Sequence, residues 1–209
     1  MAAGLNLALQ RLWWRRKARH PVLQALLNQP LHAHPFHETR YVVIDLETTA
    51  LEPSQGEIAS IAWVVIERGA IHLNQARYFH LSLENEVGQS AVFHQLTDSD
   101  LEQGVNIKVA LEALLNSIAN SVLVFHNAQL DMGFINRATS TLWGAPLLMP
   151  LVDTLQVERK RLLQRTEAIQ AGDLRLFQCR QRYALPDVSL HDALGDALAT
   201  AELWLAMNS

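Results

Sequence analysis

The sequence predicts an α/β domain in which one mixed sheet is flanked by helices. Short runs of apolar, β-branched and aromatic residues, each of strand length, recur after residue 40. Longer stretches between the later runs repeat apolar residues at helical spacing. The order is three strands, a helix, and then alternating strands and helices, which is typical of a layered domain with a mixed sheet.

Five segments are expected to form the strands. They are residues 41–44, 58–66, 71–83, 122–125 and 151–152. The first, Tyr-Val-Val-Ile, ends at Asp45 and has the composition of a buried central strand. Residues 67–70, Glu-Arg-Gly-Ala, predict a hairpin turn between the second and third strands.

The expected helices follow from apolar residues spaced three and four apart. They lie within residues 101–119, 130–138, 154–163 and 190–207, with a short helix near 174–183. Ser189 and Asp192 are three residues apart, like the pair of a capping box, and predict where the last helix begins.

The composition is that of a folded domain. The chain has 209 residues, of which 49% are hydrophobic and 18% charged. No stretch approaches the roughly 20 apolar residues that span a bilayer. Because Cys179 is the single cysteine, no intrachain disulfide can form, and the cytoplasm is the expected location.

Residues 1–40 are expected to form a basic extension to a domain at 41–209. The extension carries six Lys/Arg and one Glu, a net charge of +5, whereas the remaining 169 residues carry −9. Leu5, Leu9, Leu12 and Trp13 predict a helix. A helix that docks on the body or binds a partner is favoured, and a membrane-surface helix or a transit peptide are the alternatives. A secretory signal is not expected, because the apolar part precedes the charges.

Two further patterns have weak functional interpretations. His32, His34 and His37 could bind a metal, but they lie in a proline-containing segment that favours a linker. A basic stretch at residues 159–182 could hold a polyanion despite the negative total charge.

Asp45 and Glu47 come directly after the first strand and are two positions apart. In extended chain such residues point to the same face, about 6.5–7 Å apart along the strand. Two carboxylates so placed can flank a cation that prefers oxygen ligands, such as Mg²⁺ or Mn²⁺. The alternative is an exposed strand end with two solvated acids, which the preceding apolar run disfavours.

Three later polar residues stand beside other apolar segments. Asp131 follows a buried strand at a strand-to-helix junction, where α/β folds build sites. A first-turn acid favoured by the helix dipole is the alternative. His191 and Asp196 flank the start of the last helix, and on a regular helix they would diverge by about 140°. They meet at one site only if His191 lies in a loosened first turn.

Three segments together resemble the motifs of the DnaQ-like 3′–5′ exonucleases of the DEDDh subclass, the family of the epsilon proofreading subunit. They are Asp45-Leu-Glu47-Thr-Thr, Phe125-His-Asn-Ala-Gln-Leu-Asp131-Met-Gly-Phe-Ile and His191-Asp-Ala-Leu-Gly-Asp196-Ala-Leu-Ala-Thr-Ala201. Leu151-Val-Asp153-Thr154 is similar to a further recurrent segment of the family. The resemblance runs from about residue 41 to residue 207, with the motifs in the family's order.

The resemblance implies an RNase H-like fold and phosphodiester hydrolysis with two divalent metal ions, Mg²⁺ or Mn²⁺. It implies that Asp45 bridges both ions and that Glu47 and Asp196 complete the site of the ion that activates water. Asp131 would support the second ion, and His191 would accept the proton of the attacking water.

The same resemblance implies a pocket for the 3′-terminal nucleotide. The backbone around Thr48 and Thr49 would contact the nucleotide. Weaker candidates, for which local structure is the alternative, are Leu46, Leu51, His94 and Asn127. Ala50, Leu130 and Gln95 depart from residues common in the family, which affects substrate preference and not the metal ligands.

The favoured function is a 3′–5′ exonuclease that acts on single-stranded DNA or DNA 3′ ends in proofreading or repair. The alternatives are an exoribonuclease that trims RNA ends and a non-catalytic module that binds nucleic acid or protein through the extension. The chain ends at Ser209, just after the last helix, so an enzyme that stands alone or is tethered differently from a replicative subunit is expected. The extension is the candidate for docking a protein partner.

Overall fold

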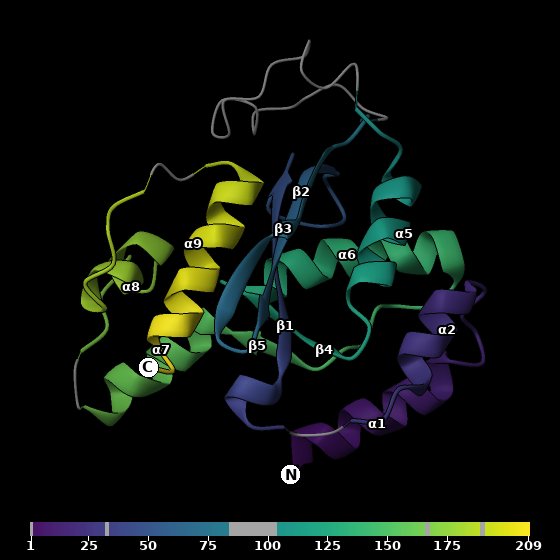
Figure 1. The fold of residues 1–209 in the computed structure, drawn as a ribbon. Coiled ribbons are helices and arrows are strands. Elements are labelled where there is room, and N and C mark those ends of the chain that lie inside the picture. Colours follow the sequence, from purple (N-terminus) through teal and green to yellow (C-terminus); the bar gives the residue numbers. More distant parts are fainter. Residues whose placement is uncertain (1, 32–33, 84–103, 166–167, 189–190) are drawn as a thin grey trace.

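The fold is built on one mixed five-stranded sheet in the order β3-β2-β1-β4-β5 (Figure 1). A computed structural model describes residues 2–31, 34–83, 104–165, 168–188 and 191–209. The strands are β1 (Arg40–Thr48), β2 (Ile58–Glu67), β3 (Ala70–His80), β4 (Ser121–Phe125) and β5 (Leu151–Asp153). Strands β1, β2 and β3 pair antiparallel, whereas β4 is parallel to β1 and β5 is parallel to β4. The predicted mixed sheet is confirmed.

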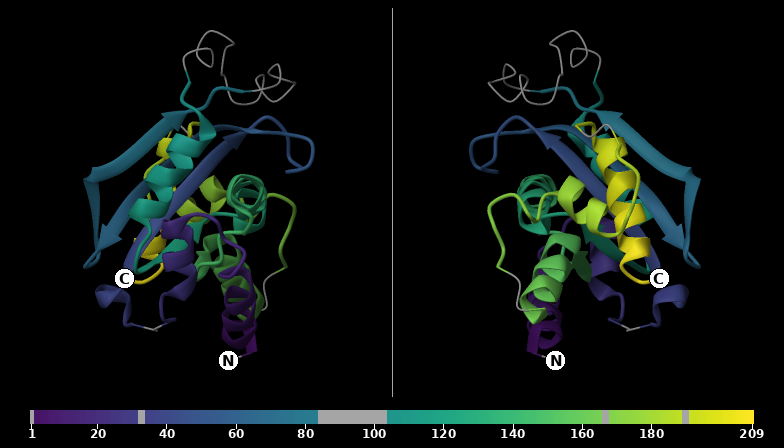
Figure 2. Two further views of the ribbon diagram at one scale, coloured as in Figure 1. Left: turned by 90° about the vertical axis from the view of Figure 1, so that its right-hand side faces the viewer. Right: turned by 90° about the vertical axis from the view of Figure 1, so that its left-hand side faces the viewer.

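Helices cover both faces of the sheet. They are α1 (Ala2–Trp14), α2 (Pro21–Asn28), α5 (Ile107–Ser117), α6 (Ala128–Trp143), α7 (Thr154–Gln164), α8 (Leu176–Arg182) and α9 (Ala193–Ala206), with a 3₁₀ turn, η1 (Phe36–Glu38). Figure 2 shows α5 in front of the sheet in one view and α9 in front of it in the opposite view. The sheet is therefore the middle layer.

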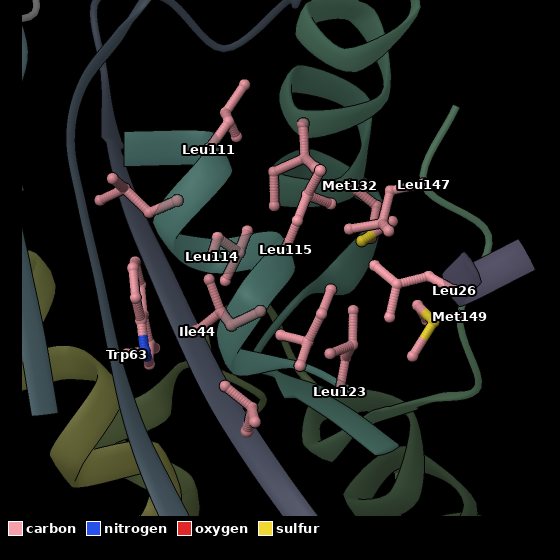
Figure 3. Packing of buried hydrophobic residues seen from close by; sticks show 14 of the residues in the cluster. Leu26, Ile44, Trp63, Leu111, Leu114, Leu115, Leu123, Met132, Leu147 and Met149 are labelled. Atoms are coloured by element: carbon pink, nitrogen blue, oxygen red, sulfur yellow. The ribbon is translucent and has the colours of Figure 1, made fainter. Parts of the chain in front are cut away.

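Strand β1 supplies one row of side chains to each core. Val42, Ile44 and Leu46 join the cluster that includes Trp63 of β2 and leucines of α2 and α5 (Figure 3). Tyr41 and Val43 join the opposite cluster, formed with α9 and Cys179. Because successive side chains alternate between faces, Asp45 and Glu47 continue the row that faces α9.

The hairpin between β2 and β3 forms where the sequence predicts it. Glu67 pairs with Ala70, and the two residues between them, Arg68 and Gly69, have φ of 53° and 74°. Two positive φ angles match a type I′ turn, whose twist suits paired strands.

The last helix begins later than the sequence predicts. Asp192, not Ser189, is the N-cap of α9, and its side chain accepts a hydrogen bond from the Gly195 N–H at 2.8 Å. The prediction that Ser189 begins this helix is wrong, because Asp192 occupies the cap position. Ser189 itself lies outside the described residues. A similar side-chain cap at Asn106 starts α5, and the predicted 101–119 helix is shorter than expected.

Part of the N-terminal extension belongs to the main core. Leu23, Leu26 and Leu27 of α2 are at most 4% exposed and pack into the cluster of Figure 3. Arg11 of α1 is buried and donates hydrogen bonds to the carbonyls of Leu26 and Gln29, at the end of α2. The extension is therefore docked on the body through α2 and Arg11, whereas Leu9, Leu12 and Trp13, whose spacing predicts the first helix, are exposed. In the described ranges, no helix has the length and apolarity to cross a membrane.

Candidate active site

Three of the predicted carboxylates converge at the C-terminal end of β1, which continues past residue 44 to Thr48 and so includes Asp45 and Glu47. Ligand oxygens of Asp45, Glu47 and Asp196 all lie within 4.8 Å of one another. Among the described residues, no other group of three or more His, Cys, Asp or Glu side chains is close enough to hold a metal ion. The histidines of the N-terminal segment form no such group there, and His32 lies outside the described residues.

The sheet register explains why Asp45 and Glu47 face α9. Asp45 pairs with Ala62 and Glu47 with Ser60, and the register then shifts between Glu47 and Thr48. Such an irregularity redirects the chain at a strand end. The two acids are therefore the last residues of the regular β1 row, and Asp196 meets them from the first turn of α9.

Asp131 lies beside this group, in the first turn of α6. Asp131 is 6% exposed, and hydrogen bonding from the backbone N–H groups of Asp131 itself and Leu46 offsets part of the rise in its pKa. The bond from Leu46 joins α6 to β1 between the two motif acids. The negative charge of Asp131 is close enough to raise the pKa of Asp45. All four predicted carboxylates thus share one site.

Burial and the charges of neighbouring carboxylates raise the pKa of each acid. The pKa of Asp45 is well above its usual value, first through burial and then through the charges of Asp131, Asp196 and Glu47. Burial and neighbouring carboxylates raise the pKa of Glu47 to about 8. Burial also raises the pKa of Asp131 to about 7 and of Asp196 to about 6. A nearby cation would lower these pKa values, because it favours the charged form of each carboxylate.

One oxygen of the cluster has no partner among the described residues. Asp196 Oδ1 is buried without a hydrogen bond, whereas Oδ2 accepts from the His191 backbone N–H at 3.4 Å. A buried carboxylate oxygen left unpaired is costly unless a cation occupies the space before it. Four carboxylates supply the oxygen donors that Mg²⁺ and Mn²⁺ prefer. The residues present therefore fit a divalent cation.

His191 precedes α9 and does not occupy its first turn. It lies two residues before Ala193, is exposed, and has φ of 91°. Its backbone N–H donates to Asp196 Oδ2 at 3.4 Å, which places the two residues next to each other. The 140° divergence expected on a regular helix does not arise, because the chain reaches His191 before helical geometry begins.

The candidate substrate residues differ in what their side chains do. Thr48 is buried and donates to the Ala50 carbonyl at 2.8 Å, and Thr49 Oγ1 accepts from the Glu57 N–H at 2.9 Å. The Leu46 side chain lies in the core, whereas Leu51 is 80% exposed. The threonines therefore shape the loop after β1, and Leu51 is available for contact.

Two more of the candidates complete the set. Asn127 is exposed at the start of α6, with φ of 76° and ψ of 54°. His94 lies outside the described residues.

Two acids in or beside the motifs have roles that the sequence did not assign. Asp192 raises the pKa of Asp45, Glu47 and Asp196. Asp153 accepts hydrogen bonds from the backbone N–H groups at the start of α6. The sequence does contain a signal for this capping role of Asp153. The residue stands between a short strand and a helix, and it forms an Asp-Thr pair with the next residue.

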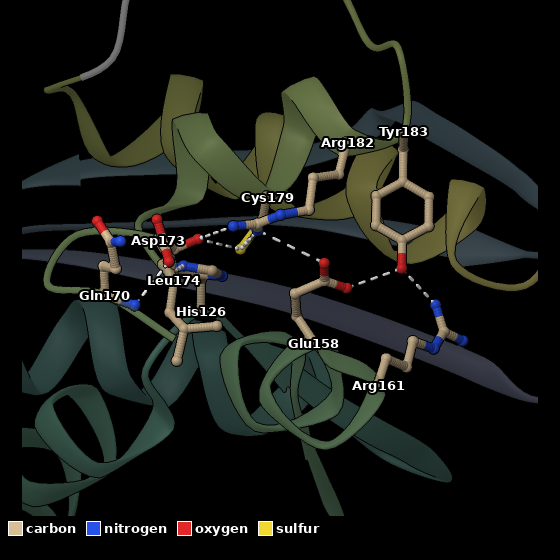
Figure 4. Close-up of polar contacts among 9 residues, drawn as sticks. All are labelled: His126, Glu158, Arg161, Gln170, Asp173, Leu174, Cys179, Arg182 and Tyr183. Atoms are coloured by element: carbon tan, nitrogen blue, oxygen red, sulfur yellow. Dashed lines mark hydrogen bonds and ion pairs between the residues drawn. The ribbon is translucent and has the colours of Figure 1, made fainter. Parts of the chain in front are cut away.

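The basic stretch at residues 159–182 is partly structural. Arg161 donates to the Tyr183 hydroxyl at 2.6 Å, and Arg182 pairs with buried Glu158 at 3.5 Å (Figure 4). Arg180 is also buried and bonded within the protein. Arg159, Lys160, Arg165 and Arg175 are exposed, as is Arg182 despite its ion pair. The stretch therefore offers fewer free charges to a polyanion than the sequence suggests.

Comparisons with known proteins agree with this geometry. Residues 42–204 match the model of the RNase_T family, described as exonuclease. The chain is 28% identical over 173 residues to the PolC-type DNA polymerase III of Thermotoga petrophila, covering 81% of this chain and 12% of that protein. It is 29% identical over 181 residues to the DNA polymerase III epsilon subunit of Buchnera aphidicola, covering 81% and 75%. The chain thus spans about an eighth of the length of the PolC-type relatives.

Solved structures share the fold. Cell-death related nuclease 4 superposes with a TM-score of 0.68 at 13% identity, over 82% of this chain and 64% of that one. E. coli exonuclease I in complex with a dT13 oligonucleotide superposes with a TM-score of 0.66 at 16% identity, over 82% and 41%. These likenesses confirm the RNase H-like fold that the motifs implied.

Proposed function

The chain belongs to the RNase_T family of exonucleases, and from that membership we propose that it removes nucleoside monophosphates from DNA 3′ ends. The observation that carries this proposal is the convergence of Asp45, Glu47 and Asp196, with Asp131 beside them. The three motifs come from separate parts of the chain and supply one acidic site. Such a site is built for hydrolysis of a phosphodiester with metal assistance.

Two divalent cations, Mg²⁺ or Mn²⁺, are the proposed cofactors. Asp45 would contribute to both, Glu47 and Asp196 to one, and Asp131 to the other. The raised pKa values of these acids and the unpaired Oδ1 of Asp196 support the assignment. When bound, the cations would neutralise the carboxylates and stabilise the charge that develops on the attacking and leaving oxygens.

His191 is the proposed general base. A ring nitrogen of the neutral imidazole accepts a proton from the water whose oxygen attacks the phosphorus. The bond between phosphorus and the 3′ oxygen of the preceding nucleotide breaks, and that oxygen takes up a proton. The exposure of His191 and the hydrogen bond of its backbone N–H to Asp196 support the role.

The terminal nucleotide is proposed to lie against the loop after β1. The backbone around Thr48 and Thr49 would contact its 3′ end, and exposed Leu51 would contact its base or sugar. Asn127, Leu46 and His94 are further proposed contacts. The hydrogen bonds that Thr48 donates and Thr49 accepts within their own loop support a pre-formed surface at this position.

Single-stranded DNA is the proposed substrate. The relatives are named as DNA polymerase III proteins, and one solved neighbour is described in complex with a dT13 oligonucleotide. Proofreading or repair in the cytoplasm is the proposed setting. Residues 41–209 would form the exonuclease domain, which agrees with the family match at 42–204.

A protein partner is proposed to bind the exposed face of α1. Leu9, Leu12 and Trp13 are 59%, 47% and 53% exposed along one side of this helix. Lys17 lies over the Trp13 ring at 3.4 Å. The helix lies at the end of the molecule away from the start of α9 (Figure 1), so a partner there would leave the acidic site open. The substitutions Leu9→Glu and Trp13→Glu should abolish binding of this partner without lowering nuclease activity.

The proposed reaction is tested with two labelled oligonucleotides of one sequence, as DNA and as RNA. We expect single-nucleotide shortening of the DNA from its 3′ end with Mg²⁺ or Mn²⁺ and none with a chelator. Asp45→Asn should abolish shortening, and equal activity in this variant would contradict the site. Faster shortening of the RNA would favour the exoribonuclease. Binding of DNA without shortening would favour the non-catalytic module.

A further inference from the structure

Arg180 is a buried cation that joins the two segments carrying His191 and Asp196. Its side chain is 2% exposed. From α8, Nη1 donates to the Ala199 carbonyl of α9 at 2.7 Å, and Nη2 donates to the Pro186 carbonyl at 3.0 Å. Nη1 also lies 2.8 Å from Glu202 Oε2. One guanidinium therefore contacts both α9, which holds the motif aspartate, and Pro186, which lies five residues before the histidine.

The loop needs such anchoring because His191 adopts an unfavourable backbone conformation. Its φ of 91° is rarely adopted by a residue with a Cβ atom, and such a conformation persists only where its surroundings hold it. The His191 N–H donates to Asp196 on one side, at 3.4 Å. On the other side, Arg180 holds Pro186, while Asp187 and Val188 are exposed.

We propose that Arg180 is a positioning residue for His191. By holding Pro186 beside α9, it limits where the chain can place the imidazole relative to Asp196. The planar guanidinium suits this role because two separate nitrogens reach two carbonyls and a carboxylate, whereas a lysine has a single nitrogen. The proposal rests on the general-base role proposed above for His191. Arg180 itself touches none of the four motif carboxylates in the described hydrogen bonds and ion pairs.

Three variants separate positioning from a general loss of structure. Arg180→Met retains an apolar side chain of similar length, Arg180→Lys retains the charge, and Glu202→Gln retains an acceptor for Nη1. We expect kcat of Arg180→Met to fall about tenfold or more while KM changes less than about twofold, since small misplacement of a reacting group is costly. Arg180→Lys should be intermediate, and Glu202→Gln should match the parent. Mn²⁺ affinity should be unchanged in all three.

A double-mutant cycle with His191→Ala tests whether Arg180 affects kcat through His191. His191→Ala should lower kcat roughly 100-fold or more, and adding Arg180→Met should then lower it less than about twofold further. An equal factor in both backgrounds would overturn the positioning role of Arg180 alone. Parent-like kcat in His191→Ala would overturn the proposed base and the role of Arg180 with it. The same cycle with Arg180→Lys gives the answer if Arg180→Met does not fold.

Discussion

Asp153 Oδ1 accepts a hydrogen bond from the backbone N–H of Asn127 at 3.0 Å, which ties the end of β5 to the start of α6. The same carboxylate accepts from Ala128 at 3.2 Å and caps α7 through Leu155 at 3.0 Å. Since α6 carries Asp131 in its first turn, the Asp153 side chain holds the start of the helix that places Asp131 in the site.

Asp153→Ala should therefore destabilise the protein. Three backbone N–H groups from two helix starts lose their acceptor, at a cost of about 1–3 kcal/mol. Urea unfolding measures the change. Asp153→Asn is the matched control, since it keeps an oxygen acceptor and should lose less. Equal losses for both variants would contradict the hydrogen-bond explanation.

Metal-free protein should lose stability as the pH rises from about 4 to about 8 through the acids of the site. Their folded-state pKa values are raised, reaching about 8 for Glu47, so the folded protein holds more protons than the unfolded chain in this window. Each of these acids stabilises the fold at low pH and loses that contribution as it ionises. Saturating Mg²⁺ should remove this pH dependence of stability, because the bound cation offsets the repulsion among the carboxylates.

Glu47→Gln isolates this effect from the other titrating groups. We expect the metal-free variant to depend less on pH than the parent and to be more stable at pH 8, because one buried charge is gone. Thermal unfolding at several pH values, with and without Mg²⁺, gives the comparison. A variant with the parent's pH dependence would show that repulsion at Glu47 does not limit stability.

Gly195→Ala should weaken the start of α9. A Cβ at this position would lie 2.6 Å from Asp192 Oδ2, which is too close for the present cap. Loss of an N-cap costs about 1 kcal/mol, and the displaced first turn carries Asp196. We expect weaker Mn²⁺ binding by calorimetry. Asp192→Asn keeps the cap acceptor and should retain helix stability; equal unfolding free energies for the parent and Gly195→Ala would refute the clash.

Leu26→Ala tests whether the extension is part of the folded core. Leu26 is 1% exposed, so its truncation should cost about 2–5 kcal/mol. Leu9→Ala is the control, because Leu9 on the neighbouring helix is 59% exposed and should change stability by less than about 0.5 kcal/mol. Both are measured by chemical denaturation. A neutral Leu26→Ala would mean that α2 adds little to the core.

Much of the fold could be predicted because its signals are local. The run before Asp45, the Arg-Gly hairpin and the periodic helices each depend on residues close in sequence. The helix starts were harder. The spacing of Ser189 and Asp192 matches a capping box, but which residue caps the helix depends on where the incoming chain turns. In the structure Asp192 is the cap and accepts a hydrogen bond from the Gly195 N–H.

The sequence by itself determined which groups do the proposed chemistry: four carboxylates and one histidine, in the order and spacing of an exonuclease family. Only the tertiary structure decided how they are held. Strand alternation directs Asp45 and Glu47 toward α9, and Asp196 meets them there. Arg180 reaches the Ala199 carbonyl across 19 residues, and Asp153 reaches the Asn127 N–H across 26 residues, so both act on backbone groups far away in sequence. Such contacts leave no pattern in the sequence, because the backbone partner can belong to any residue.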